Sequence, residues 1–377
     1  MKNYFNSLSP FKRRYLPIII SLSALYFISI ILIFTLPSIT HKTITSKENQ
    51  TKSGWPVRLA APYIDLSSWV DPANAYSING VPNLAKLCDD SGFSYFNLGF
   101  IQPDSVKPLE SDGTIRWGWG GYYSLSPNGG GSSQYQGILT SLEGLRKKGG
   151  DYAISIGGQL GDAPWVVTQN QNALEKFYSE IIELYSLKRM DLDIEESNQD
   201  YGQNIVNAKA IKSVQDKTNV EITLTIPIMP SGWQEKQLNI IKAYLDAGVD
   251  VKLINSMTMC YGTGVNSDED YGTASVRAIT NSVKQLKTIY SNYGVLLTDD
   301  QAYLKTGATF SIGYESDLYP TFTTSMAATI VEDAKRHNYG QISMWSMGRD
   351  AMLENNKAIT EPFTYSKELR KYENIYN

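Results

Sequence analysis

Acidic residues alternate with aliphatic residues in one short stretch, residues 189–197, which reads Arg-Met-Asp-Leu-Asp-Ile-Glu-Glu-Ser. This spacing predicts a β-strand, because successive side chains of a strand point to opposite faces. Asp191, Asp193 and Glu195 then share one face, and the aliphatic residues share the other. Like charges stacked this closely cannot all ionise at low cost, so the column lowers stability and suggests chemistry. The alternative is an exposed edge strand whose acids lie in water.

The composition excludes several classes of protein. The chain has 377 residues, 42% of them hydrophobic, and a formal net charge of -4, so it is long and apolar enough for a core and has no basic field for nucleic acid. Its two cysteines, Cys88 and Cys260, form no disulfide framework or CxxC metal site, although one long-range bridge stays open. A catalytic triad or a zinc site would have to rest on His337, which we expect at the end of a surface helix. We therefore expect no metal and no cofactor.

The first 58 residues differ from the rest. Residues 1–14 end in a basic cluster, and residues 15–40 form an uncharged apolar run long enough to span a bilayer. We favour an uncleaved transmembrane anchor with a cytoplasmic N-terminus over a signal peptide, because no clean cleavage site follows. The remainder of the chain would then lie outside the cytoplasm, or be secreted if the segment is cleaved. Residues 41–58 are polar and indicate a linker, and residues 59–377 form the folded domain.

Apolar β-type runs alternate with amphipathic helical stretches along the folded part, which indicates βα units and a parallel sheet. The expected strands are residues 59–66, 95–101, 151–156, 190–195, 221–226, 253–259, 308–314 and 341–345. The expected helices are residues 81–90, 134–148, 172–187, 203–217, 234–247, 273–291, 323–337 and 367–372. Strands that are each followed by a helix match an α/β fold of the (β/α)8 TIM barrel type. A doubly wound open sheet is the alternative, although the glycines at 129–131 do not form a phosphate-binding loop.

In a barrel, the acidic column would lie where catalytic sites are found. Catalytic groups of such barrels lie at the carboxyl ends of the strands, and the column lies on the fourth expected strand with Glu195 nearest the mouth. A closed barrel has no edge strand, so the exposed-edge interpretation then loses its basis.

Several motifs, in order, resemble those of family 18 glycoside hydrolases, the chitinases and their relatives. Asp191-Leu-Asp193-Ile-Glu195 is similar to the family's DxDxE signature, and Ser155-Ile-Gly157-Gly158 is similar to its SxGG motif. The segment from Ser343 through Trp345 to Asp350 resembles the one that places a floor tryptophan under the sugar. The opening of the folded part at 61–65 and the loop at 117–122 look like those of the family's bacterial single-domain branch. The resemblance covers nearly all of residues 59–350.

The resemblance implies a retaining, substrate-assisted hydrolysis of β-1,4-linked N-acetylglucosamine, in which the acetamido oxygen of the substrate is the nucleophile. Glu195 would be the general acid and later the base for water, which requires a raised pKa. Asp193 would hold the acetamido N–H and share a proton with Asp191, so that the two titrate as a pair. Trp345 would form the apolar floor under the sugar.

The sixth expected strand departs from the family's Met-x-Tyr-Asp pattern, and two registers are possible for Met257-Thr-Met259-Cys260-Tyr261-Gly262. The first keeps Tyr261 as the partner of the acetamido group and puts Gly262 in place of the aspartate. The second puts Met259 in place of the tyrosine and Cys260 in place of the aspartate. We prefer Tyr261, and Met257 and Met259 would line the same site. Lys188 also stands where the family often has aspartate, so the level of activity is open.

Aromatic residues in the loops after the strands are candidates for outer sugar subsites or for loop packing: Trp69, Trp117, Trp119, Tyr122, Trp165 and Trp233. Glu196 and Glu315 are polar neighbours without an assigned role. The expected partner is chitin or another N-acetylglucosamine oligosaccharide, with the membrane as a second partner through the N-terminal segment. Two alternatives remain open: a sugar-binding protein of the same fold that does not cleave, and a hydrolase of N-glycan cores or peptidoglycan sugars.

Overall fold

The structure is a computed structural model, and it describes residues 54–373. The expected basic segment 1–14, the apolar run 15–40 and most of the linker 41–58 lie outside the described residues. Within residues 54–373, no helix combines the length and the apolar character needed to cross a membrane.

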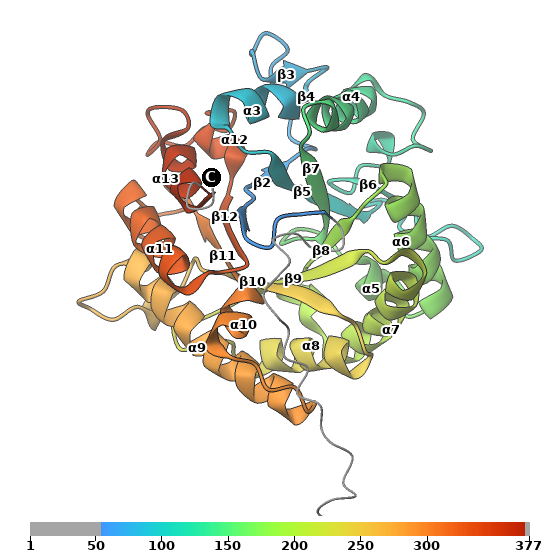
Figure 1. Ribbon diagram of the computed structural model, residues 1–377. Helices are drawn as coiled ribbons and strands as arrows, with labels where there is room; N and C mark the ends of the chain where they lie inside the picture. Colours follow the sequence, from blue (N-terminus) through green and yellow to red (C-terminus); the bar gives the residue numbers. More distant parts are fainter. Residues whose placement is uncertain (1–53, 374–377) are drawn as a thin grey trace, which may run out of the picture. The chain divides into compact units, whose positions relative to one another are not determined.

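The strands form one curled sheet with a small hairpin beside it (Figure 1). All neighbouring pairs of the sheet are parallel except β6, which pairs antiparallel with β5. The bounds of the strands are β1 Leu59–Ala60, β2 Tyr63–Asp65, β3 Ser77–Ile78, β4 Val81–Pro82, β5 Tyr95–Pro103, β6 Trp117–Trp119, β7 Asp151–Gly157, β8 Arg189–Asp193, β9 Glu221–Pro227, β10 Val251–Met257, β11 Thr306–Ser311 and β12 Gln341–Trp345.

The helices surround the sheet, and most of them follow a strand (Figure 1). Their bounds are α3 Leu84–Ser91, α4 Ser133–Lys147, α5 Pro164–Val167, α6 Gln171–Tyr185, α7 Tyr201–Thr218, α8 Glu235–Asp246, α9 Tyr271–Asn292, α10 Asp299–Leu304, α11 Thr324–His337, α12 Met347–Asp350 and α13 Thr364–Glu373. Short 3-10 helices cover η1 Tyr123–Leu125, η2 Glu196–Gln199 and η3 Gly262–Gly264.

The first expected strand is divided in two. β1 pairs with β12, β2 pairs with β5, and Ala61 and Pro62 separate the two halves. Proline has no N–H to donate to a ladder, so the run changes partner there. Because the two halves belong to one continuous run, the first and last strands of the curled sheet meet through it. The pairing is therefore consistent with the expected (β/α)8 barrel.

Two other boundaries differ from the expectation. The fourth strand ends at Asp193, so Glu195 lies just beyond β8. The first helix starts at Leu84 rather than Val81, because Val81 and Pro82 pair with β3 and the Asn83 side chain caps the helix. The remaining expected strands and long helices agree with the structure to within two or three residues.

Candidate active site

Asp191 lies at the centre of a buried polar layer inside the sheet. Its Oδ1 accepts hydrogen bonds from Thr223 at 2.5 Å and Thr225 at 2.8 Å, both on β9. Its Oδ2 accepts from Ser155 of β7 at 2.7 Å and from Tyr63 of β2 at 2.9 Å. Burial raises the pKa of Asp191, and these four hydroxyl groups oppose that rise. Both of its oxygens are thus fully occupied as acceptors.

Asp193, two residues further along β8, has a different environment. Its side chain is buried, and Oδ1 has no hydrogen-bond partner within residues 54–373. Burial, followed by the charges of Glu195 and Asp191, raises its pKa well above the ordinary range of aspartate. Asp193 therefore presents an unused acceptor oxygen in a buried position. Its proton sharing with Asp191 stays a prediction, since the hydroxyl groups occupy the oxygens of Asp191.

Glu195 is partly exposed and follows the end of β8, immediately before η2. Burial and then the neighbouring charge of Glu196 raise its pKa to about 7. Its carboxyl group has no hydrogen bond to any residue between 54 and 373. Such a group carries a proton near neutral pH and can give it up, as a general acid must.

The glycines after Ser155 bring β7 close to β8. Gly157 and Gly158 have φ values of 114° and 96°, which residues with a side chain rarely adopt. A Cβ atom on Gly157 would lie 2.2 Å from the carbonyl oxygen of Asp193, and the N–H of Gly158 donates to that same oxygen at 3.1 Å. The two glycines therefore fix the backbone that carries Asp193.

Trp345 ends β12, and its half-buried ring lies beside two other aromatic rings. Ring centroids are 5.6 Å apart for Phe100 and 6.4 Å apart for Tyr63. Tyr63 also binds Asp191, so the indole and the acidic column are connected through one side chain. This brings the expected floor residue to the same end of the sheet as the acids.

The preferred role of Tyr261 does not agree with its position. Tyr261 is buried, its hydroxyl lies 3.0 Å from Ser275 Oγ of α9, and its ring packs 5.3 Å from Tyr271. It therefore faces the helix layer, where the hydroxyl is already paired. The second register, with Cys260 in the aspartate position, fits the structure better.

Cys260 is exposed and has a left-handed φ of 55°. Desolvation of its sulfur and then the charge of Glu315 raise the pKa of its thiol to about 11, with a smaller contribution from Glu195. Met257 ends β10 and is buried, and Met259 is half-buried two residues later, at the same end of the strand.

Four of the expected subsite aromatics have no free face. Trp117, Trp119, Trp165 and Trp233 are almost fully buried. Trp119 donates to Tyr185 at 3.1 Å, and Trp165 donates to the carbonyl of Asn198 at 2.8 Å. These rings are loop packing, because a buried ring offers no surface on which a sugar can stack. Tyr122 and Trp69 are 58% and 63% exposed and remain candidates.

Lys188 lies at the far end of the strand from Glu195. It precedes β8, is 58% exposed, and its Nζ is 3.5 Å from Asp151 Oδ2 at the start of β7. The departure at this position therefore affects the amino-terminal end of the sheet and leaves the acidic column untouched.

Sequence reasoning assigned no role to several residues of the polar layer. Tyr63, Thr223 and Thr225 bind Asp191, and Asn255 of β10 donates to Tyr63 at 3.2 Å and to Thr225 at 3.1 Å. The available signal was weak: Thr223 and Thr225 are polar positions two apart in an otherwise apolar strand, which places them on one face.

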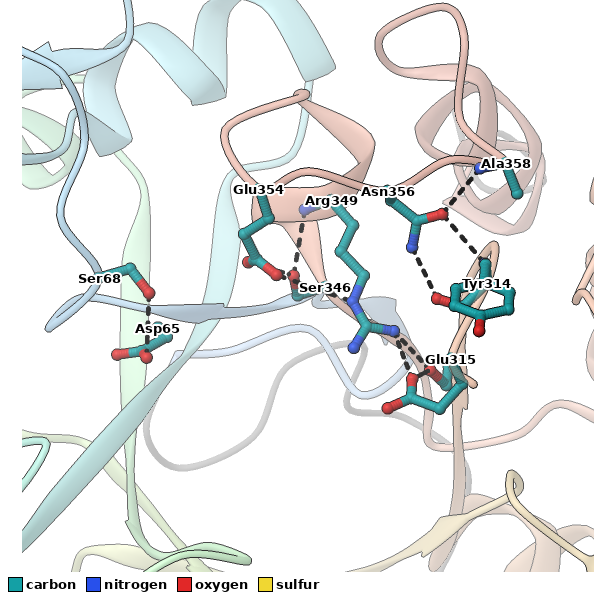
Figure 2. A network of polar contacts seen from close by, with 10 residues as sticks. Asp65, Ser68, Tyr314, Glu315, Ser346, Arg349, Glu354, Asn356 and Ala358 are labelled. Atoms are coloured by element: carbon teal, nitrogen blue, oxygen red, sulfur yellow. Dashed lines mark hydrogen bonds and ion pairs between the residues drawn. The ribbon is translucent and has the colours of Figure 1, made fainter. Parts of the chain in front are cut away.

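A second polar network lies at the carboxyl ends of β2, β11 and β12 (Figure 2). Arg349 of α12 donates to Glu315 Oε2 at 2.6 Å and to Ser311 Oγ at 2.7 Å. Ser346 donates to Glu354 at 2.8 Å, while Arg349 Nε is 3.7 Å from Glu354 Oε2. Glu315, expected as a polar neighbour, is thus held by the arginine.

Comparisons with known proteins agree with the resemblance seen in the sequence. No family model matches the chain. The chain is 28% identical over 312 residues to an Escherichia coli (strain K12) protein described as "Probable bifunctional chitinase/lysozyme", covering 79% of this chain and 32% of that protein. It is 27% identical over 312 residues to Endochitinase 11 of Metarhizium anisopliae, covering 79% of this chain and 54% of that protein. The chain thus spans about a third and about half of these relatives.

Solved structures share the fold. The catalytic domain of the hyperthermophilic chitinase from Pyrococcus furiosus matches with a TM-score of 0.70 at 24% identity, over 85% of this chain and 97% of that one. A Pseudoalteromonas aurantia GH18 chitinase matches with a TM-score of 0.52 at 11% identity, over 84% of this chain and 99% of that one. Together with the relatives, these matches support a family 18 chitinase-like domain in this chain.

Proposed function

We propose that this domain is a chitinase-type glycoside hydrolase that cleaves β-1,4 linkages between N-acetylglucosamine units. The observation that carries the proposal is the pair formed by Glu195, whose pKa is raised to about 7, and Asp193, which has a buried acceptor without a partner in the described part of the chain. Glu195 can hold a proton for the leaving oxygen, and the free oxygen of Asp193 can accept the N–H of a bound sugar. The named activities of the relatives, "chitinase/lysozyme" and "Endochitinase", support the same reaction class.

The geometry supports a retaining, substrate-assisted mechanism. The acetamido oxygen of the bound sugar attacks C1 while Glu195 protonates the departing glycosidic oxygen. Asp193 Oδ1 accepts the acetamido N–H and steadies the oxazolinium ion that forms. Glu195, now ionised, takes a proton from the water that opens the ring of the intermediate, so C1 keeps its configuration. The partly exposed Trp345 supplies an apolar face under the sugar.

Turnover of a fluorogenic chitooligosaccharide by the full-length chain tests this proposal. We expect Glu195→Gln to lower kcat by at least about 100-fold, because the amide cannot transfer a proton. Glu143→Gln is the matched control, since Glu143 lies exposed on α4 and pairs with Lys147 of the same helix. Absent turnover in the wild type, or equal turnover in wild type and Glu195→Gln, overturns the proposal.

The position of Cys260 favours one alternative, a sugar-binding protein that does not cleave. In the second register a thiol stands where the family pattern has a carboxylate, and the charge of Glu195 contributes to the raised pKa of that thiol. Calorimetry with chitotetraose distinguishes the two: heat of binding with intact tetramer recovered afterwards supports the binding protein, and recovered dimer or monomer supports the hydrolase.

We also propose that residues 15–40 anchor the protein and that the catalytic domain lies outside the cytoplasm. The support is the apolar run that follows the basic cluster of residues 12–14. Membrane fractionation with protease accessibility in intact cells tests it. Recovery of the full-length chain in the soluble fraction contradicts it.

A further inference from the structure

Glu195 lies immediately before η2, and its carboxyl group has no hydrogen bond to any residue between 54 and 373. The backbone therefore has to set where this carboxyl group lies. On one side the sheet holds it, because the N–H of Ile194 donates to the carbonyl of Thr225 at 2.9 Å. On the other side Glu196 is exposed and has a left-handed φ of 45°. A residue with a side chain keeps this conformation only where its surroundings impose it, so a contact beyond Glu196 must hold the segment.

That contact is Asn198, which is fully buried in η2. Its N–H donates to the carbonyl of Glu195 at 2.8 Å. Its side-chain Nδ2 donates to the carbonyl of Gly158 at 3.1 Å, and its Oδ1 accepts from the N–H of Ala163 at 2.9 Å. Gly158 and Ala163 are the two ends of the loop between β7 and α5. One side chain therefore closes this loop and joins it to the segment that carries Glu195.

These hydrogen bonds connect the two acids of the proposed pair from outside their strand. The N–H of Gly158 donates to the carbonyl of Asp193 at 3.1 Å, and the carbonyl of Gly158 accepts from Asn198. Asn198 in turn donates to the carbonyl of Glu195. Planar peptide groups and a short amide side chain leave few free torsions along this path. The path therefore fixes how the backbone of Glu195 lies relative to that of Asp193.

Two side chains from the helix layer hold Asn198 itself. Its carbonyl accepts hydrogen bonds from Trp165 Nε1 at 2.8 Å and from Asn204 Nδ2 at 2.9 Å. Trp165 belongs to α5 and Asn204 to α7, and both are fully buried. The position of Asn198 therefore depends on two helices as well as on η2.

The two neighbours of the Asn198 side chain require an amide. The carbonyl of Gly158 needs a donor and the N–H of Ala163 needs an acceptor, and an asparagine side chain offers both. An aspartate would lack the donor, and an aliphatic side chain of the same size would lack both. A buried backbone group would then lose its partner, which costs more than the hydrogen bond itself contributes.

We propose that Asn198 is a positioning residue, which holds the carboxyl group of Glu195 within reach of the glycosidic oxygen that leaves. This inference rests on the proposed function, because it concerns the placement of the general acid. A general acid has to lie within hydrogen-bond reach of the atom that it protonates, and a small displacement lowers the rate strongly. Since Asn198 is fully buried, it acts through Glu195 and not through contact with the sugar.

The test compares two substrates of the full-length chain that differ in their need for a proton. Cleavage of chitotetraose releases a sugar whose oxygen must be protonated, whereas dinitrophenyl chitobioside releases a phenolate that departs without a proton. We expect Asn198→Ala to lower kcat/KM for chitotetraose about tenfold to 100-fold, and that for the dinitrophenyl substrate by less than about threefold. The measure is kcat/KM, because it covers the steps up to cleavage of the bond and excludes the later attack of water. Glu195→Gln should show the same selectivity with a larger loss.

A second variant approaches Asn198 from the helix layer. Trp165→Phe keeps an aromatic ring and removes one hydrogen bond to the Asn198 carbonyl, so it should cause the same selective loss, by about twofold to fivefold. Ser141→Ala is the matched control. Its buried Oγ also has two backbone partners, the N–H of Leu84 at 2.9 Å and the carbonyl of Pro82 at 2.7 Å, where α4 meets the start of α3. This variant should change both kcat/KM values by the same factor.

The outcomes separate the inference from the proposed function. Equal losses on the two substrates in Asn198→Ala and Trp165→Phe, or no loss in either variant, overturn the inference and leave the proposed function standing. Trp165→Phe alone decides if Asn198→Ala does not fold. A wild type that cleaves neither substrate overturns the proposed function itself.

Discussion

The three carboxyl groups of β8 and its end have different environments, although they alternate regularly in the sequence. Asp191 has four hydroxyl donors, Asp193 has an oxygen without a donor among the described residues, and Glu195 reaches solvent. Neighbouring acids whose environments differ in this way divide the roles of acid and stabilising charge between them. The role of each residue thus follows from its partners.

The charge of Glu196 affects the pKa of Glu195, the residue before it in the chain. This charge is the second cause, after burial, of the raised pKa of Glu195. Removing that charge in Glu196→Gln lowers the pKa, so Glu195 loses its proton at a lower pH. If Glu195 is the general acid, the alkaline limb of kcat/KM moves to lower pH by up to about one unit. A pH profile measures this shift.

The matched control is Glu183→Gln, which changes an exposed glutamate on α6 and should leave the profile in place. An unchanged alkaline limb in Glu196→Gln, or a move to higher pH, contradicts the assignment of that limb to Glu195.

The end of β7 positions β8 through its backbone. Gly157 lies opposite Asp193 in the parallel ladder, and its missing side chain makes room for the Asp193 carbonyl. Ser155, two residues earlier on β7, donates to Asp191. One strand end therefore holds two of the three acids, which gives the paired glycines a role beyond that of a turn.

Gly157→Ala should destabilise the protein and reduce activity. The new Cβ atom would lie 2.2 Å from a backbone oxygen and would sit on a residue with a φ of 114°. We expect a loss of about 2 kcal/mol or more in the free energy of unfolding. Denaturant unfolding and kcat/KM measure the two effects.

Gly149→Ala is the control for backbone strain without a steric clash. Gly149 has a φ of 80° but no described atom within 4 Å of the place where an alanine Cβ would lie. Its expected cost is about 1 kcal/mol, with activity retained. Equal losses for the two variants would show that contact with Asp193 is not the cause.

The whole sheet depends on the broken first strand. β1 joins the sheet to β12 and β2 joins it to β5, so the seven residues 59–65 connect the first and last strands. At the break, the carbonyl of Ala61 accepts hydrogen bonds from Asn97 Nδ2 at 2.8 Å and from Ser343 Oγ at 2.6 Å. Side chains from both neighbouring strands thus replace part of the ladder that is missing beside Pro62.

Ser343→Ala should weaken this junction. It removes a buried hydrogen bond to the Ala61 carbonyl, for which we expect a cost of about 1–2 kcal/mol in the free energy of unfolding. Ser291→Ala, at an exposed serine of α9, should change it by less than about 0.5 kcal/mol. Similar unfolding curves for both variants would contradict a role of Ser343 in stabilising the junction between β1 and β2.

Short-range sequence patterns were sufficient to predict most of the strands and helices. Apolar β-type runs predicted the strands, and amphipathic stretches predicted the long helices, because these signals act over a few residues. The boundaries that were wrong depend on distant partners: Val81 pairs with β3 instead of starting a helix, and Pro62 lies between two different neighbouring strands.

The sequence by itself determined the strand of Asp191 and Asp193 and the face that they share, because side-chain alternation is a property of the extended backbone, whereas Glu195 lies just beyond the end of β8. Tertiary structure alone decided which groups surround each acid, since Tyr63, Thr223 and Asn255 come from other strands. Tertiary structure also decided the orientations of the aromatic side chains. Tyr261 turns toward α9, and Trp119 and Trp165 lie in the core, because burying a large ring with its polar atom paired depends on residues far away in the chain.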